Sequence, residues 1–83
     1  MKAKVKGLRY APVTGEYIRL DAFLKFIGEA ETGGEAKHII SDGKVSVDGG
    51  KCIQRGKKVY RGSFVGYEGK LWRITGAPAS DGN

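Results

Sequence analysis

Hydrophobic residues recur at helical spacing in two short segments in the first half of the chain. The first segment has apolar residues at i, i+3, i+4 and i+7: Leu20, Phe23, Leu24 and Ile27. The second has them at i, i+3 and i+4: Ala36, Ile39 and Ile40. Such spacing puts the apolar side chains on one face of a helix. The pattern therefore predicts two helices, near Asp21–Ile27 and Gly33–Asp42, each with one buried face.

Both predicted helices have recognisable ends. Thr32 is followed three residues later by Glu35, which forms a capping box in which both side chains satisfy free amides at the helix start. Gly28 and Gly43 follow the two apolar stripes, and glycine closes a helix at little cost because it readily adopts the left-handed conformation. Two short helices with a tight connection are typical of a helix-turn-helix-like pair.

After Gly43 the chain changes to the alternating pattern of half-buried strands. Asp48-Gly49 and Glu68-Gly69 are turn signals between two pairs of these segments. The fold class that follows is α+β, with two short helices packed on a small, mostly antiparallel sheet. The candidate strands are Lys44–Val47, Lys51–Ile53, Val59–Tyr60, Phe64–Tyr67 and Leu71–Thr75.

The two ends of the chain differ in composition from the middle. Residues 1–15 are basic and contain little apolar surface, and Pro12 argues against a helix there. The alternation around Ala3 and Val5 leaves two readings, a short edge strand or a mobile basic arm. Residues 76–83 are polar and small, which is typical of a disordered tail. We therefore expect an N-terminal arm at 1–15, one domain at 16–75 and a tail at 76–83.

Charge is concentrated in two blocks. The 83 residues carry a net charge of +6. Residues 1–15 contribute +4, residues 16–42 contribute −3, residues 44–61 contribute +5 and residues 62–83 balance. Localised positive charge favours a polyanionic partner, although lysines that only keep a small protein soluble would explain the sum equally well.

Composition also excludes several classes of protein. The sequence has no run of about 18 apolar residues, which is the length that a membrane-spanning helix needs. The N-terminus also lacks the apolar core of a secretory signal. Cys52 is the only cysteine, so no internal disulfide can form. We therefore expect a cytoplasmic protein with no membrane association, and a monomer.

Catalytic and metal-binding chemistry has little support in the sequence. His38 has no second histidine or cysteine at the spacing of zinc ligands, and Cys52 has no evident orienting partner. The carboxylates are scattered rather than paired. We therefore predict no catalytic residues, no metal site and no cofactor. Among the aromatic residues, Trp72 and Tyr67 are expected in the core, whereas Tyr60 lies next to the basic loop and is the candidate for stacking on a base.

The order of these motifs resembles a known family. Arg19-Leu20-Asp21-x-x-Leu24, followed by Gly28, Thr32, Ala36 and Gly43-x-Val45-x-Val47-Asp48-Gly49, is similar to the alpha-L RNA-binding motif. This is the domain first seen in ribosomal small-subunit protein four, here called S-four-like. The likeness is strongest to small stand-alone bacterial members of the YaaA/YbcJ kind, and it covers about residues 17–75. The sequence departs from the usual pattern by having Asp48 where Asn is commoner.

The resemblance implies a non-enzymatic module that binds structured RNA of the rRNA or tRNA class, in ribosome assembly or quality control. Arg55, Lys57 and Lys58 surround Gly56, which lets the backbone approach another chain while the cations reach phosphates. A solvated, solubilising role is the alternative for Lys25, and Arg19 could instead pair with Glu16 or Asp21. A protein-interaction module that uses the sheet is the alternative function. The predicted RNA-binding residues are Arg19, Lys25, Lys37, Lys44, Arg55, Lys57, Lys58 and Arg61.

Overall fold

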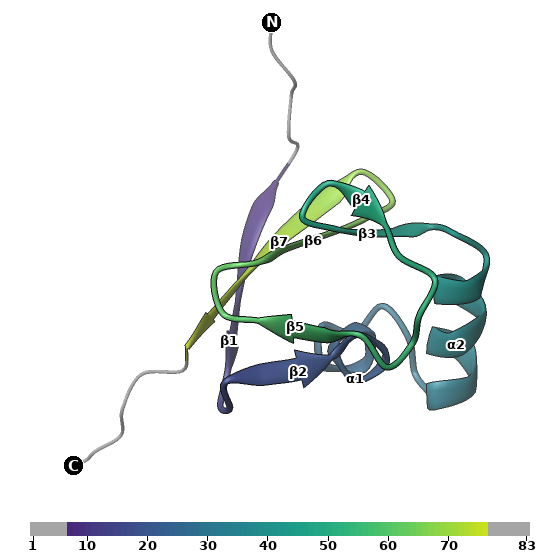
Figure 1. The fold of residues 1–83 in the computed structure, drawn as a ribbon, viewed down its shortest axis with the longest axis horizontal. Coiled ribbons are helices and arrows are strands. Elements are labelled where there is room, and N and C mark those ends of the chain that lie inside the picture. Colours follow the sequence, from purple (N-terminus) through teal and green to yellow (C-terminus); the bar gives the residue numbers. More distant parts are fainter. Residues whose placement is uncertain (1–6, 77–83) are drawn as a thin grey trace, which may run out of the picture.

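Two helices and seven strands follow one another in the computed structural model, which describes residues 7–76 (Figure 1). Both helices begin and end within one residue of their predicted positions, as the apolar stripes and terminal glycines require. Neither helix in the described part is long and apolar enough to cross a membrane. The elements are β1 (Leu8–Val13), β2 (Tyr17–Arg19), α1 (Leu20–Phe26), α2 (Gly33–Ser41), β3 (Val45–Val47), β4 (Gly50–Lys51), β5 (Lys58–Tyr60), β6 (Phe64–Tyr67) and β7 (Lys70–Gly76).

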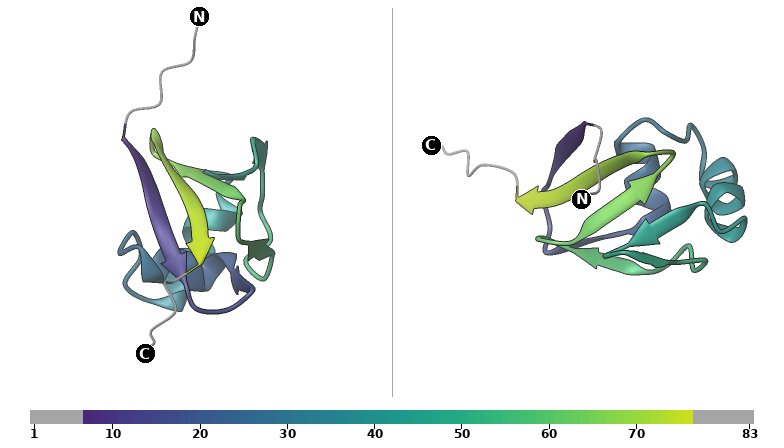
Figure 2. Two further views of the ribbon diagram at one scale, coloured as in Figure 1. Left: turned by 90° about the vertical axis from the view of Figure 1, so that its left-hand side faces the viewer. Right: turned by 90° about the horizontal axis from the view of Figure 1, so that it is seen from above.

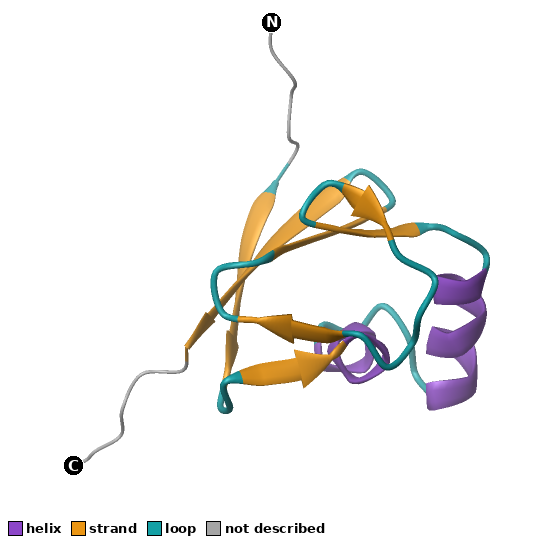
Figure 3. Cartoon of the chain, viewed as in Figure 1, coloured by secondary structure: helices purple, strands orange, loops and turns teal. Residues whose placement is uncertain are grey.

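The strands form two sheets, and α1 and α2 lie next to each other beside the smaller sheet (Figure 3). The larger sheet has the order β1-β7-β6-β3-β4, and only its β1–β7 pair is parallel. Strands β2 and β5 form a separate antiparallel pair, which we call the β2–β5 ribbon. The architecture confirms the predicted α+β class with two short helices and mostly antiparallel strands.

Strand β1 lies inside the segment that was expected to be an N-terminal arm. It runs alongside β7, from Leu8 opposite Leu71 to Val13 opposite Gly76. Ala11 and Val13 are buried because they fill the inner face of the sheet. Residues 8–13 of this segment thus form an edge strand that is part of the larger sheet. The alternation at residues 3–5 and the tail at 77–83 lie outside the described residues.

Two tight turns connect the hairpins of the larger sheet. Asp48 and Gly49 have φ values of 51° and 89°, and Glu68 and Gly69 have values of 53° and 77°. Positive φ at both central residues defines the mirror-image turn that matches the twist of a hairpin, so both predicted turns are confirmed. Asp48 also accepts a hydrogen bond from the amide of Phe64 at 2.9 Å. The carboxylate thus joins this turn to β6.

One hydrophobic core joins both sheets and both helices, and Figure 2 shows the arrangement of these elements from two further sides. The Phe23 ring meets the Trp72 ring edge to face, with centroids 6.4 Å apart, so Trp72 is a core residue as predicted. Because α1, α2 and the β2–β5 ribbon all contribute to this core, their packing fixes these elements relative to one another. The core consists of Ala11, Val13, Leu20, Phe23, Leu24, Ala30, Ala36, Ile40, Val45, Val59, Val65, Trp72 and Ile74.

Candidate nucleic-acid interface

The basic loop between β4 and β5 packs against the start of α1. The amide of Leu20 donates to the carbonyl of Lys57 at 2.8 Å, and the amide of Asp21 donates to the carbonyl of Arg55 at 3.0 Å. These bonds satisfy amides that a helix start leaves unpaired, and no side chain caps α1. A further bond from the Lys57 amide to the Gln54 carbonyl tightens the loop. The loop therefore takes the place of a capping residue, and α1 fixes its position.

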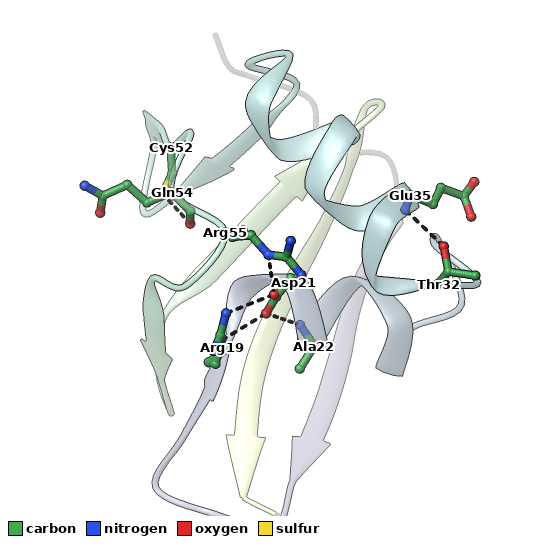
Figure 4. Close-up of polar contacts among 8 residues, drawn as sticks. All are labelled: Arg19, Asp21, Ala22, Thr32, Glu35, Cys52, Gln54 and Arg55. Carbon is green, nitrogen blue, oxygen red and sulfur yellow. Dashed lines mark hydrogen bonds and ion pairs between the residues drawn. The ribbon is translucent and has the colours of Figure 1, made fainter.

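Asp21 reinforces this attachment from its buried carboxylate (Figure 4). Arg19 donates to both carboxylate oxygens, from Nε at 3.2 Å and from Nη2 at 3.1 Å. Arg55 donates from Nε to Oδ2 at 2.9 Å, and the Ala22 amide donates to Oδ1 at 2.8 Å. One carboxylate thus holds two arginines that are 36 residues apart in sequence. We call these three side chains the Asp21 cluster.

The protonation of Asp21 follows from two opposing effects. Burial alone would raise the pKa of this carboxyl because it disfavours the charged form. The hydrogen bonds from Arg55, the Ala22 amide and Arg19 act in the opposite direction and outweigh burial. The pKa of Asp21 consequently lies below its ordinary value of 3.8. At neutral pH the carboxylate is charged and keeps both arginines in place.

The guanidinium of Arg55 reaches from Asp21 toward the first turn of α2, as Figure 4 shows. A Cβ atom added at Gly33 would lie 3.5 Å from Arg55 Nη2, which is an ordinary contact distance, so the guanidinium lies directly beside this helix start. Lys37 is exposed and stands four residues after Gly33, which places it on the same face of α2, one turn further on. The structure thus gathers Arg55 and Lys37 beside the start of α2.

The start of α2 is capped by its own side chains. Thr32 Oγ1 accepts a hydrogen bond from the Glu35 amide at 3.0 Å, as the capping box predicts. The Glu35 carboxylate, however, accepts from the amide of Glu31 at 2.8 Å, one residue before the expected position. Neither of the next two amides, at Gly33 and Gly34, is bonded within the described residues. N–H groups at a helix start favour anions.

Lys57 and Lys58 extend the positive charge from the loop into the β2–β5 ribbon. Both side chains are exposed, and Lys58 stands opposite Arg19 in the register of the ribbon. Lys57 also lines an open groove of about 410 Å³, which it shares with Lys51, Gln54 and the β3–β4 turn. Arg55 and Lys57 thus lie in the docked loop, and Lys58 is the first residue of β5 directly after it.

The other predicted cations lie apart from the Asp21 cluster. Arg61 donates from Nε to the carbonyl of Gly15 at 3.0 Å and from Nη2 to that of Thr14 at 3.4 Å. It thus connects the β5–β6 turn to the β1–β2 turn, which is a structural contact that the sequence did not reveal. Lys25 is exposed on α1, and Lys44 is exposed between α2 and β3. No hydrogen bond or ion pair joins either lysine to the Asp21 cluster in the described part of the chain.

The sequence does not reveal the contacts of two residues in this region. The sequence offers Asp21 as one possible partner for Arg19, but nothing in it predicts that Arg55 joins the pair. Nothing in the sequence singles out Tyr17, although its ring packs against Tyr60 with centroids 5.6 Å apart. Tyr17 stands opposite Tyr60 in the register of β2 and β5. This pairing cannot be read from the sequence because the two strands lie some forty residues apart.

The remaining candidate groups offer little further chemistry. His38 is exposed on α2, and Cys52 is half buried against the core. Within residues 7–76, no three His, Cys, Asp or Glu side chains are grouped as metal ligands would be. What the region does present is fixed positive charge and N–H donors. Such an arrangement is suited to holding anionic groups of a ligand.

The model of the S4 domain family matches residues 11–75, so the chain belongs to this family. S4 domains generally bind RNA. The match begins inside β1, which agrees with that strand being part of the domain. Among curated proteins, none matches the sequence significantly.

Proposed function

We propose that this protein is a non-enzymatic, cytoplasmic RNA-binding module that acts as a monomer on structured RNA. The observation that carries the proposal is the attachment of the basic loop to α1. Because two backbone hydrogen bonds and the Asp21 cluster hold the loop, the side chain of Arg55 and the backbone that carries Lys57 are fixed before a ligand binds. Cations held in place before binding lose less conformational freedom when they contact a ligand.

Phosphates are the groups that this surface suits best. Nε of Arg55 is bonded to Asp21, but the guanidinium has further N–H donors, and it points toward the start of α2. A phosphate placed between Arg55 and the first turn of α2 would receive charge from Arg55 and Lys37 and N–H donors from Gly33 and Gly34. The exposed Lys57 and Lys58 would contact phosphates further along the backbone.

Such a surface is better suited to the backbone of double-helical RNA than to reading a base sequence. The deep major groove of A-form RNA hides its base edges, so proteins recognise its shape, phosphates and 2′-hydroxyls. Membership of the S4 family supports RNA as the partner. We propose ribosomal RNA or tRNA as the target class, in ribosome assembly or quality control.

The direct test is binding of the purified protein to a hairpin RNA and to a hairpin DNA of the same sequence. We expect fluorescence anisotropy to show tighter binding to the RNA, and the affinity to fall steeply as salt is raised. Cross-linking in cells, followed by sequencing of the bound RNA, would identify the target. An affinity that is equal for RNA and DNA, or absent for both, would contradict the proposal.

The alternative function, a protein-interaction module, is favoured by one feature of the larger sheet. Leu8 and Tyr10 on edge strand β1 are 42% and 63% exposed. An open strand edge with apolar side chains can pair with another chain. Self-association in analytical ultracentrifugation, together with no binding to either hairpin, would favour this function over RNA binding.

A further inference from the structure

The β2–β5 ribbon exposes one face that the core does not use. In its register Tyr17 stands opposite Tyr60, Ile18 opposite Val59 and Arg19 opposite Lys58. Side chains alternate between the two faces of a strand. The central pair faces inward, where Val59 is 1% exposed and Ile18 packs against the core. The outer two pairs therefore share the other face, which combines two tyrosines with two cations.

The two tyrosines on this face are exposed but ordered by their neighbours. Tyr17 and Tyr60 are 42% and 50% exposed, and their rings are inclined at 52° with centroids 5.6 Å apart. Lys58 Nζ lies 4.9 Å from the centroid of Tyr17, so the cation covers that ring. Tyr17 thus contacts both the Tyr60 ring and Lys58, while half of Tyr60 remains open to solvent.

A stable ribbon does not require this exposure. A cross-strand aromatic pair stabilises a hairpin, but it could do so equally well on the buried face. Exposed aromatic rings beside cations have the composition of surfaces on which nucleobases stack, where each ring contacts the face of a base and the cations neutralise the neighbouring phosphates. The ribbon is also joined to the proposed phosphate site, because Arg19 belongs both to it and to the Asp21 cluster.

We infer that Tyr60, supported by Tyr17, stacks on an unpaired nucleobase that adjoins the helical RNA bound by the basic loop. This inference rests on the proposed function and makes it more specific, since the preferred ligand becomes an RNA helix with a bulged or terminal unpaired nucleotide. Arg19 and Lys58 contact the phosphates that flank that nucleotide. Stacking does not depend on base identity, so the preference is for an unpaired base and not for a sequence.

The experiment compares two RNA hairpins, one fully paired and one with a single bulged 2-aminopurine. We expect the wild-type protein to bind the bulged hairpin about ten-fold more tightly and to quench the 2-aminopurine fluorescence. Tyr60→Leu keeps an apolar side chain but cannot stack, so it should lose both effects and still bind the paired hairpin as the wild type does. Tyr60→Phe should retain both. Tyr10→Leu is the matched control, an exposed tyrosine of the larger sheet that should change neither.

The outcomes separate this inference from the proposed function. If the wild type binds both hairpins equally, or if Tyr60→Leu keeps the preference, the stacking site is wrong while RNA binding stands. If the wild type binds neither hairpin, the proposed function fails and this inference fails with it. A second measurement needs no variant: a hairpin with a bulged 5-iodouridine should cross-link to Tyr60 or Tyr17 under ultraviolet light. Cross-links found only elsewhere would overturn the inference.

Discussion

The two helices of this domain begin in opposite ways. At α1 the amides of Leu20 and Asp21 donate to carbonyls of the basic loop, so another segment of the chain closes the helix start. At α2 the cap comes from the adjacent Thr32 side chain, and the amides of the two following glycines are left without partners in the described structure. One helix start positions the cationic loop, and the other remains available to an anion.

The comparison of the two helix starts distinguishes residues that position the basic loop from residues that are open to a ligand. Asp21 is buried, accepts four hydrogen bonds and aims two arginines, so we treat it as a positioning residue. Lys57 and Lys58 are exposed, and their side chains are open to a ligand. Substitutions at the first kind of residue should change stability and binding together. Substitutions at the second kind should change binding alone.

The largest effect on stability is expected for Asp21→Asn. The change removes the charge that both arginines contact, and hydrogen bonds to charged groups contribute about 1.5–3 kcal/mol each. Because Arg19 and Arg55 are 55% and 42% exposed and can be solvated afterwards, we expect a total loss of only about 2 kcal/mol. Urea unfolding measures this value. Glu16→Gln, at an exposed carboxylate, is the control, and an equal loss there would show that the cluster does not stabilise the loop.

The same carboxylate predicts a dependence of stability on pH. Since the pKa of Asp21 is lowered in the folded protein, its contribution is complete above the ordinary value of 3.8 and is lost as the pH falls through the folded value. The unfolding free energy of the wild type should therefore decrease more between about pH 5 and pH 2 than that of Asp21→Asn. Urea titrations across this range measure the difference. Parallel curves for the two proteins would contradict the lowered pKa.

Arg55→Ala should have an intermediate effect. A glycine-containing loop of this composition would be expected to tolerate alanine at little cost, but the structure adds a bond to a buried carboxylate. Arg19 continues to pair with Asp21, so we expect a loss of about 1 kcal/mol, measured as a lower melting temperature. Lys57→Ala, in the same loop, is the control and should stay within about 0.5 kcal/mol of the wild type. If both variants were equally stable, Arg55 would not anchor the loop.

Thr32→Ala tests the other helix start and should cost about 1 kcal/mol, because it removes the cap of α2 without disturbing the loop. Thr32→Ser keeps the hydroxyl and should restore stability. Melting temperatures of the three proteins check the effect. RNA binding by Thr32→Ala should keep the salt dependence of the wild type, because no charge is lost; a changed dependence would show that the two helix starts are not independent.

The sequence predicts most of this fold because its signals are local. Helix stripes, the capping box and the two hairpin turns each lie within a few residues, and all of them appear in the structure. Signals that depend on distant partners were missed. Nothing near Arg55 indicates that it meets Asp21, 34 residues away, and nothing near Arg61 indicates its bonds to Thr14 and Gly15.

Strand β1 could not be predicted for the same reason. Its few apolar residues are buried only because the strand pairs with β7 at the far end of the domain. The candidate site shows the same limit. Residue type alone indicated the cations of the loop, whereas the docking of the loop on α1, which determines where those cations point, depends on contacts distant in the sequence.

The salt dependence of RNA binding tests the central claim most directly. Removing a cation that contacts a phosphate lowers the slope of log affinity against log salt by about one unit. We therefore expect the double variant Lys57→Ala, Lys58→Ala to lose about two units of slope on a structured RNA hairpin. The matched control removes two exposed cations of the larger sheet, Arg9→Ala with Arg73→Ala, and should leave the slope near that of the wild type. An unchanged slope in the loop variant, at an unchanged melting temperature, would contradict the claim that the docked loop binds the phosphates of RNA.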